Sequence, residues 1–452
     1  MTDHVPEYQR IDIPGPKFHI DLPALDALHP VHFSRRLLVF RSDSDLRTRQ
    51  QLQGLEAGLR RLVDQCPVLG GLVVTTRGVH AIRHQDTGLA LIIRDLKSEM
   101  STYRELEQRN FAPSLLPYDD LVPIPLNIRE SSTAPACMVQ FTVIEGGSIL
   151  TWAMSHSVAD GRGTDILLKL LSENVRYAQT DLNYSGPPEW VGMDRSAIKS
   201  VRSDVPFDVT HHPAYSAGSI PPAVEQTQID STLPSPSLAT IVIALSKDGL
   251  ERLKTACQPE QEQGWVSSHD AICALLWRTH VLTCGDAGNK RENTSIFFPS
   301  DARRKLGLEP DWVPNAVYQV IASVKLGDMR EMEETRALRM AASAIRTALS
   351  SIQSEDVKSY FQHLETVGWV DWGFLAMTPV DFAMGTDWSS EVYADDWGEA
   401  FGALYSWRYP SEPESSRMGA VLPKRRDGSA EVMLTVGEDQ VEMVERMWAA
   451  WM

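Results

Sequence analysis

The chain has 452 residues, a formal net charge of -17 at pH 7 and a hydrophobic share of 43%. This length and composition are typical of a globular protein with two or three domains. A nucleic-acid or anionic-membrane partner requires a basic face, so the charge argues against both classes of partner.

The start of the chain and its cysteines indicate a compartment. The opening MTDHVPEYQRIDIPGPKF lacks the basic patch and apolar stretch of a signal peptide. No run approaches the ~18 apolar residues of a membrane-spanning helix. The five cysteines are scattered and never spaced as C-x-x-C, so neither a disulfide framework nor a zinc site is expected. We therefore expect a cytoplasmic protein without a resident metal.

The first part of the chain alternates strand patterns with helix patterns. RRLLVF, at 35–40, is typical of a strand. Leucines then recur in steps of three and four, which predicts a helix that begins after Asp43 or Ser44 and ends at Pro67. Two apolar runs joined by Glu-Gly-Gly at 145–147 predict a hairpin, and a helix pattern follows from Thr164.

A proline-rich stretch without periodicity separates the two halves of the chain. It runs from 206 to 236 and predicts a long crossover linker, because so long a loop inside one compact domain would be unusual. His211 and His212 in this stretch are expected to be solvated rather than to bind a metal.

The second half restarts the same pattern. LATIVIAL predicts a strand, followed by a helix that Ser246 caps, and SSHDAICALLWRTHVL predicts a buried helix. TSIFFPSDARR and NAVYQVIASV predict strands, one long helix is expected over 329–352, and a strand and a helix close the chain. Strands and helices on both sides of a linker predict an α/β protein with an N-terminal domain at 1–205 and a C-terminal domain at 237–452.

A lone histidine follows the apolar run that ends at Met154, and an aspartate follows four residues later. An imidazole is suited to general-base work near neutral pH, because its unperturbed pKa is about 6.5. His156 at the end of a buried strand would reach a cleft, and Gly161 and Gly163 are expected to supply the unusual dihedrals of the turn. The alternative is a core histidine with Asp160 as a helix cap.

These residues carry a family resemblance. SHSVADG resembles the H-x-x-x-D-G motif of the BAHD acyltransferases, especially the fungal branch that includes the trichothecene O-acetyltransferases, and His156, Asp160 and Gly161 match it. The stretch at 35–73, which ends QCPVLGGLV, is similar to the family's opening strand, first helix and P-x-L-x-G segment. The resemblance extends over almost the whole chain.

Two stretches of the second half are similar to the same family. PSDARRKL followed by VPNAV resembles D-x-R-x-R-L and Gly-Asn, with Asp301, Arg303 and Asn315 in matching places. SSHDAICALLWRTH resembles the family's central helix of the second domain.

The family's second motif, D-F-G-W-G, is present only in part. Asp396, Trp397 and Gly398 stand in its first three places, with Trp397 replacing the phenylalanine. The closing Trp-Gly is absent, and a Phe-Gly pair at 401–402 follows as a shifted remnant. The resemblance implies that this motif is structural.

The resemblance implies a fold and a reaction. The fold would be two chloramphenicol-acetyltransferase-like domains, each a mixed β-sheet flanked by helices, joined by the long crossover linker. A segment near 388–412 would cross into the first domain, and a channel between the domains would admit an acyl-CoA co-substrate and a small-molecule acceptor. His156 would deprotonate the acceptor, while Asp160 would give structural support by pairing with Arg303.

Three further residues have weaker support from the sequence. Thr386 lies in TDW, which is similar to the family's T-S-W, and is a candidate hydroxyl donor to the oxyanion. Arg304 and Lys305 are candidates for the 3′-phosphate of coenzyme A, although a solvated face is the better explanation of such a charge cluster. Thioester chemistry needs no metal, and no metal-ligand spacing is present.

The leading interpretation is an acyl-CoA-dependent O-acyltransferase that acetylates a secondary metabolite and acts as a monomer. An N-acyltransferase is an alternative, since the same base serves an amine. A condensation-type enzyme fed by a carrier protein is another, although such enzymes carry two adjacent histidines, whereas Ser155 precedes His156 here. The altered second motif keeps open a third, non-acylating class, either a cyclase or a binding module.

Overall fold

The computed structural model describes residues 7–27, 33–76, 79–124, 133–180, 192–216, 237–260, 264–285, 291–367, 371–372, 380–410 and 419–452. The chain forms two compact units. Unit 1 comprises Met1–Ser200, Gly307–Ala316 and Ser390–Glu412, and unit 2 comprises Val201–Leu306, Val317–Ser389 and Pro413–Met452.

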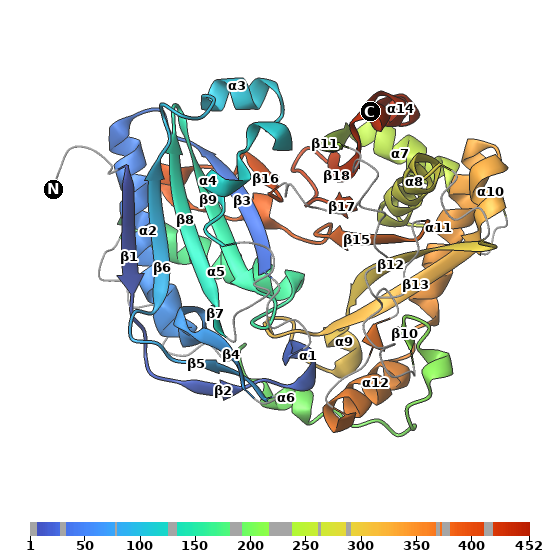
Figure 1. The fold of residues 1–452 in the computed structure, drawn as a ribbon, viewed down its shortest axis with the longest axis horizontal. Helices are drawn as coiled ribbons and strands as arrows, with labels where there is room; N and C mark the ends of the chain where they lie inside the picture. Colours follow the sequence, from blue (N-terminus) through green and yellow to red (C-terminus); the bar gives the residue numbers. More distant parts are fainter. Residues whose placement is uncertain are drawn as a thin grey trace, which may run out of the picture. The chain divides into compact units, whose positions relative to one another are not determined.

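Unit 1 is built on a mixed six-stranded sheet with the order β1-β6-β8-β9-β3-β16 (Figure 1). Its neighbours pair antiparallel except β6 and β8, which are parallel. The last strand comes from the C-terminal part of the sequence and pairs with β3 through Trp407 and Leu38. In sheet order the strands are β1 (Tyr8–Ile13), β6 (Leu89–Asp95), β8 (Cys137–Ile144), β9 (Gly147–Ser155), β3 (Phe33–Arg41) and β16 (Ser406–Arg408).

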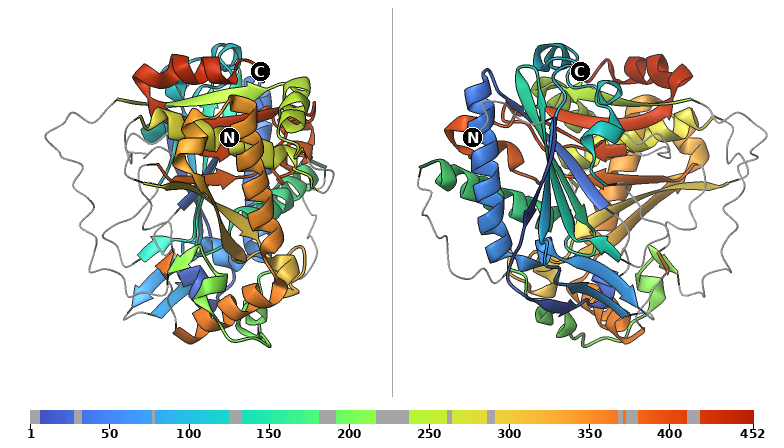
Figure 2. Two further views of the ribbon diagram at one scale, coloured as in Figure 1. Left: turned by 90° about the vertical axis from the view of Figure 1, so that its right-hand side faces the viewer. Right: turned by 60° about the vertical axis from the view of Figure 1, so that its left-hand side comes forward.

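Two long helices of unit 1 pack against each other beside this sheet (Figure 2). They are α2 (Asp45–Gln65) and α5 (Gly161–Thr180). The Ser44 side chain caps α2 by accepting from the Arg47 backbone N–H at 3.3 Å, which confirms one of the two predicted caps. The helices approach so closely that a Cβ on Gly58 would lie 3.0 Å from the Val175 nitrogen.

The remaining elements of unit 1 are short. A four-stranded sheet has the order β2-β5-β4-β7 and is formed by β2 (His19–Asp21), β5 (Val79–Arg83), β4 (Leu72–Thr76) and β7 (Thr133–Pro135). The short helices are α1 (Ala24–Ala27), α3 (Tyr103–Gln108), α4 (Tyr118–Leu121), α6 (Ser196–Lys199) and α13 (Gly398–Phe401).

Unit 2 contains a second mixed six-stranded sheet, with the order β11-β18-β17-β15-β12-β13. Strand β15 is parallel to both of its neighbours, and the other pairs are antiparallel. The strands are β11 (Leu238–Leu245), β18 (Ala430–Gly437), β17 (Gly419–Val421), β15 (Phe382–Thr386), β12 (Asn293–Asp301) and β13 (Val317–Lys325). A separate two-stranded pair joins β10 (Tyr215–Ser216) to β14 (Asp371–Trp372).

The helices of unit 2 include the predicted ones, with one correction, and two that the sequence analysis did not predict, Arg303–Leu306 and Ser354–Val367. The helix expected over 329–352 is two helices, because the Glu333 side chain accepts hydrogen bonds from Thr335 N and Arg336 N and so begins a new helix. The helices are α7 (Lys247–Ala256), α8 (Ser268–Thr283), α9 (Arg303–Leu306), α10 (Leu326–Glu331), α11 (Glu334–Ser351), α12 (Ser354–Val367) and α14 (Val441–Trp448).

The predicted linker is described only up to residue 216, and the rest of 206–236 lies outside the described residues, so the domain bounds stay predictions. His212, expected to be solvated, is 0% exposed, while His211 is exposed. The His212 Nδ1 lies 2.7 Å from the Tyr318 hydroxyl, and its ring stacks on Phe207. Burial lowers the pKa of His212 to about 4, so this ring belongs to the neutral core of unit 2.

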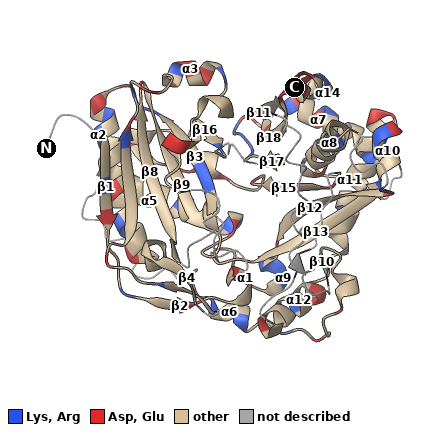
Figure 3. Cartoon of the chain, in the orientation of Figure 1, with Lys and Arg blue, Asp and Glu red and all other residues tan. Residues whose placement is uncertain are grey.

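Charged residues of both signs are distributed over the outer elements of each unit, whereas β8 and β9 carry none (Figure 3). Uncharged strands are typical of a sheet whose two faces are covered. Among the described helices, none combines the length and the apolar character that a membrane crossing requires.

Candidate active site

The predicted general base lies at a junction between a strand and a helix. All nine residues of β9 are buried, and the strand ends at Ser155. The turn that follows is closed by Val158 N, which donates to the Ser155 carbonyl at 2.9 Å, and α5 begins at Gly161. His156 is the first residue of this turn, and it is partly exposed while its neighbours in the turn are buried.

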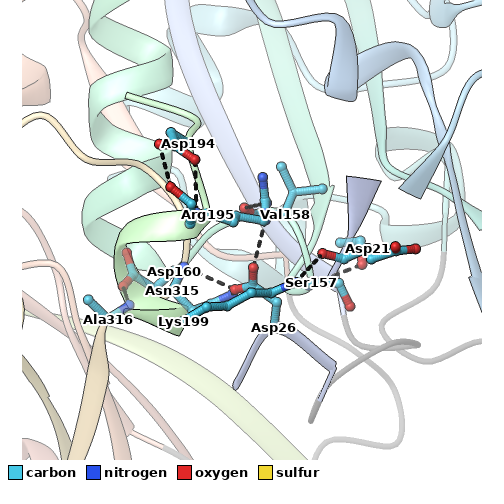
Figure 4. Close-up of polar contacts among 12 residues, drawn as sticks. Asp21, Asp26, Ser157, Val158, Asp160, Asp194, Arg195, Lys199, Asn315 and Ala316 are labelled. Atoms are coloured by element: carbon cyan, nitrogen blue, oxygen red, sulfur yellow. Dashed lines mark hydrogen bonds and ion pairs between the residues drawn. The ribbon is translucent and has the colours of Figure 1, made fainter. Parts of the chain in front are cut away.

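Asp160 is 2% exposed and binds backbone amides (Figure 4). Its Oδ1 accepts from Gly163 N at 2.8 Å and so caps α5, while Oδ2 accepts from Ala316 N at 2.9 Å. The carboxylate therefore fastens the 307–316 segment of unit 1 to the start of α5. The helix cap considered from the sequence is thus present.

The predicted partner of Asp160 lies in unit 2. Arg303 is the first residue of α9, and its NH1 donates to Asp301 Oδ1 at 2.9 Å. Because Asp160 and Arg303 belong to different units, their pairing stays a prediction.

The two glycines of the turn act differently from the expectation. Neither Gly161 nor Gly163 has a positive φ, so the predicted unusual dihedrals are wrong. Position 163 requires glycine for a steric reason instead, because a Cβ there would lie 2.0 Å from the Val313 carbonyl oxygen. A missing side chain at this position lets the 307–316 segment approach the helix.

A buried ion pair that the sequence analysis missed supports the turn. Asp26 in α1 is 1% exposed, and the Arg195 Nε donates to its Oδ2 at 2.7 Å. The Arg195 NH2 also donates to the Val158 carbonyl at 2.7 Å. Asn315 Nδ2 donates to Asp26 Oδ1 and to the His156 carbonyl, both at 2.7 Å.

Asp26 thus holds both side chains that bind the turn. Arg195 and Asn315 reach the backbone carbonyls of His156 and Val158, and both are oriented by the same carboxylate (Figure 4). Burial raises the pKa of Asp26, and the charge of Arg195 opposes that rise. In the sequence, Asp26 is noticeable only as an aspartate inside the apolar stretch LPALDAL, and no motif marks it as a functional residue.

The electrostatic surroundings of His156 favour a neutral imidazole. Burial lowers the pKa of His156 below its ordinary value, and the carboxylate of Asp160 partly opposes this shift. A neutral imidazole carries a free lone pair and is able to accept a proton from an alcohol. The turn therefore presents a neutral imidazole near pH 7.

The partial second motif packs at the other end of α5. Gly398 has a φ of +78°, and Trp397 is fully buried against Phe40, with ring centroids 5.3 Å apart. Gln179, near the end of α5, donates to the Trp397 carbonyl and accepts from Ala400 N, both at 2.8 Å. Helix α5 has 20 residues, and at 1.5 Å per residue this separates the motif from His156 by about 30 Å. The contacts of this motif are those of packing.

Asp396 and Phe401 complete this packing. The Asp396 carboxylate accepts from Gly398 N at 3.0 Å, and Arg176 lies 3.7 Å from it. Phe401 is buried against Phe40 with a centroid distance of 4.8 Å. An aromatic side chain thus stands beside Trp397 although the family's order of residues is altered.

The three remaining candidate residues of unit 2 lie at two places, the end of β15 and the helix α9. Thr386 ends β15, and its Oγ1 lies 2.8 Å from His269 Nε2. Arg304 in α9 is exposed, whereas the Lys305 ammonium donates to the Ile352 carbonyl at 2.9 Å. Lys305 therefore already has a structural contact. Within the described ranges no cluster of three metal-ligating side chains occurs.

Comparisons with known proteins find a matching family model and several similar fungal proteins. Residues 33–174 match the family described as "Trichothecene 3-O-acetyltransferase-like N-terminal domain". "Enoyl-CoA isomerase/hydratase claC" of Penicillium crustosum is 25% identical over 94% of this chain, which covers 50% of that protein. "Eremophilane O-acetyltransferase prx11" of Penicillium rubens is 24% identical over 75% of this chain and 77% of that protein.

Solved structures share the fold. The crystal structure of F. graminearum TRI101 complexed with coenzyme A and T-2 mycotoxin matches with a TM-score of 0.78 at 16% identity, covering 96% of this chain and 99% of that chain. This similarity confirms the predicted fold class of mixed sheets flanked by helices. The chain spans half the length of the claC protein, so the activity in that name is not assigned to the shared part.

Proposed function

We propose that the chain is an acyl-CoA-dependent O-acyltransferase of the trichothecene 3-O-acetyltransferase-like branch of the BAHD acyltransferases and that it acetylates a hydroxyl of a secondary metabolite, which the family match over residues 33–174 supports. The observation that carries this proposal is the geometry of His156. It is a desolvated imidazole at the end of a buried strand, on a turn that a buried ion pair and Asn315 hold in place.

The reaction that fits this base is a direct acyl transfer. The imidazole of His156 takes the proton of the acceptor hydroxyl, and the acceptor oxygen attacks the thioester carbonyl carbon. The tetrahedral intermediate then expels the thiolate of coenzyme A, which takes the proton back from the imidazolium. A general base contributes about 10²–10⁴-fold to such a step.

Thr386 is the proposed hydrogen-bond donor to the oxyanion of that intermediate. In this proposal His156 and Thr386 act on the same thioester, in the channel that the family resemblance predicts. Arg304 stays the proposed contact of the coenzyme A 3′-phosphate, since its side chain is exposed, whereas Lys305 is engaged with Ile352. The protein is proposed to act as a monomer.

The relatives support this chemistry by name. The prx11 protein is an eremophilane O-acetyltransferase, and TRI101 was solved with coenzyme A and with a mycotoxin. These statements concern those proteins. They support coenzyme A as co-substrate and a hydroxylated terpenoid as the first class of acceptor to test.

The test incubates the purified chain with acetyl-CoA and a panel of hydroxylated sesquiterpenes, and it detects both free thiol and the acetylated product by mass. We expect one acetyl group to be added, with His156→Ala lowering turnover by about 10²–10⁴-fold. His84→Ala is the matched control, because His84 is a histidine of unit 1 whose ion-pair partner Asp86 is 98% exposed. Retention of more than a tenth of wild-type turnover in His156→Ala would contradict the assignment.

The same assay separates the alternatives. A product that mild alkali cleaves is an ester, whereas an amide product indicates N-acylation. Transfer only from an acylated carrier protein indicates a condensation-type enzyme. Absence of both thiol release and product, with every acceptor and with water, indicates a non-acylating homologue.

A further inference from the structure

His269, which the proposed reaction leaves unused, contacts the proposed oxyanion donor. It is the second residue of α8, and its Nε2 lies 2.8 Å from Thr386 Oγ1. The backbone N–H of Trp388 donates to the same oxygen at 3.3 Å. Among the described residues these are the two polar contacts of that hydroxyl. All three residues belong to unit 2.

A threonine hydroxyl has one proton to give and two lone pairs with which to accept. Trp388 N–H occupies one lone pair of Thr386. If His269 Nε2 carries its proton, it occupies the second lone pair. The hydroxyl proton then has no acceptor among the residues that the structure describes and is available to a ligand. If Nε2 lacks a proton, Thr386 donates to it and offers no proton to an oxyanion.

The surroundings of His269 leave its ring neutral. Burial lowers the pKa of His269 to about 4, so the ring is neutral near pH 7 and has one N–H. The sulfur of Cys273, one helical turn away, lies 3.7 Å from Nδ1 and 3.6 Å from Nε2, so it does not select either nitrogen. Burial raises the pKa of this thiol well above its ordinary value, so it keeps its proton. The nearest contact of Nε2 is the Thr386 oxygen at 2.8 Å, and a ring proton on Nε2 gives the first arrangement.

Two charged residues beside His269 pair with each other. Asp270, the next residue, is 0% exposed, and its Oδ2 accepts from Arg346 Nε at 2.9 Å and NH2 at 2.5 Å. The same oxygen accepts from Ser267 N at 2.6 Å as part of the α8 capping box. The charge of Asp270 raises the pKa of His269 and that of Arg346 lowers it, and the effect of burial exceeds both.

We propose that His269 is a positioning residue for acyl transfer: its Nε2–H and the Trp388 N–H fill both lone pairs of Thr386 Oγ1, which turns the hydroxyl proton toward the developing oxyanion. This inference rests on the proposed role of Thr386. In this proposal His269 neither contacts the substrate nor transfers a proton. It affects the reaction only by orienting the Thr386 hydroxyl.

The test measures kcat and KM for thiol release from acetyl-CoA, with water as the acceptor. Removing an oxyanion donor costs about 10²–10³-fold in kcat, so Thr386→Val should show a loss of that size. His269→Phe should lower kcat by about 10-fold, which is the size expected for loss of one orienting hydrogen bond, with KM unchanged within about twofold. His363→Phe is the matched control, because the ring of that histidine of unit 2 stacks on Phe207, and phenylalanine preserves the stacking.

Two further comparisons distinguish positioning from a structural role. His269→Gln places an amide N–H near the position of Nε2 and should restore most of the activity, whereas His269→Asn is too short and should not. In the Thr386→Val background, His269→Phe should cause no further loss. Equal activity of the Gln and Asn variants, or losses that multiply in the double variant, would overturn the proposal.

The same variants distinguish failure of the His269 proposal from failure of the proposed acyltransferase function. If His156→Ala abolishes thiol release while Thr386→Val and His269→Phe match the wild type, acyl transfer stands and the positioning role is wrong. If His156→Ala is as active as the wild type, the proposed function itself fails. Melting temperatures of all variants identify any loss that comes from unfolding, and the Gln–Asn pair stays informative if His269→Phe does not fold.

Discussion

Two histidines of this chain stand beside carboxylates, and their surroundings differ in one respect. Burial lowers the pKa of both His156 and His269. Asp160, next to His156, binds two backbone amides, whereas Asp270, next to His269, binds the guanidinium of Arg346. The hydrogen bonds described for Asp160 thus go to backbone amides and those of Asp270 include a guanidinium, while each carboxylate partly opposes the effect of burial on the pKa of its histidine.

The tasks proposed for the two histidines, a base and a positioning donor, are compatible with this difference. A base must gain a proton during the reaction, and a nearby carboxylate stabilises the imidazolium that forms. A positioning donor must keep one proton in one place, so a neutral ring with a committed neighbour suits it better. The turn that carries His156 is also held by side chains on its carbonyls, whereas His269 is held by a regular helix. The predictions below test the support of each histidine.

The largest effect is expected from breaking the ion pair beneath the His156 turn. Asp26→Ala leaves the Arg195 guanidinium buried without its carboxylate, and such a loss costs about 3–5 kcal/mol of unfolding free energy. Chemical denaturation measures it. Asp12→Ala is the control, because the Arg10–Asp12 pair is 47% and 41% exposed and should change stability by less than about 1 kcal/mol. Equal effects of the two variants would contradict the role of Asp26 as a support.

A smaller effect is expected at Asn315, which links Asp26 to the His156 carbonyl. Asn315→Ala leaves buried acceptors unsatisfied and should lower stability by about 1–3 kcal/mol, with a decrease in kcat because the turn loosens. Asn315→Asp keeps the shape but places a second negative charge beside Asp26, so it should be less stable than the alanine variant. The reverse order would show that the two hydrogen bonds do not hold the turn.

The smallest effect concerns the pH dependence of stability in unit 2. The pKa of His269 is about 4 in the folded chain and about 6.5 in an unfolded one. Between these values the unfolded state binds more protons, so stability falls as pH decreases. His269→Gln removes this contribution and should flatten the curve between pH 6.5 and 4, by at most about 1.4 kcal/mol per pH unit. Parallel curves for wild type and variant would show that His269 is solvated and protonates freely.

Local features of the site were predictable because they depend on neighbouring residues. The apolar run that becomes β9, the histidine after it and the cap of α5 lie within a few positions, and each has a local pattern. Asp26 and Asn315 are 289 positions apart, and α1 is only four residues long. Neither periodicity nor a motif indicates that such a short helix supplies the carboxylate that supports the His156 turn.

The same reasoning explains the other differences. The helix expected over 329–352 is interrupted at Glu333, whose side chain caps the start of α11. A glutamate inside one long helix and a glutamate that caps a second helix give the same local sequence, so the sequence does not distinguish them. His212 was expected to be solvated because it lies in a proline-rich stretch, but Tyr318 and Phe207 enclose it. The contact between Gly163 and the Val313 carbonyl depends on a segment 150 positions later in the chain.

The most direct test of the central claim is the pH dependence of kcat/KM for acetyl transfer, measured for the wild type and for His156→Ala. In the wild type, kcat/KM should rise with pH along a one-proton limb whose midpoint lies below pH 6.5, because burial lowers the pKa of His156 and the neutral form is the base. In the variant, activity should be about 10²–10⁴-fold lower and the limb should vanish. A variant that keeps the limb and more than a tenth of the activity would show that another group is the base.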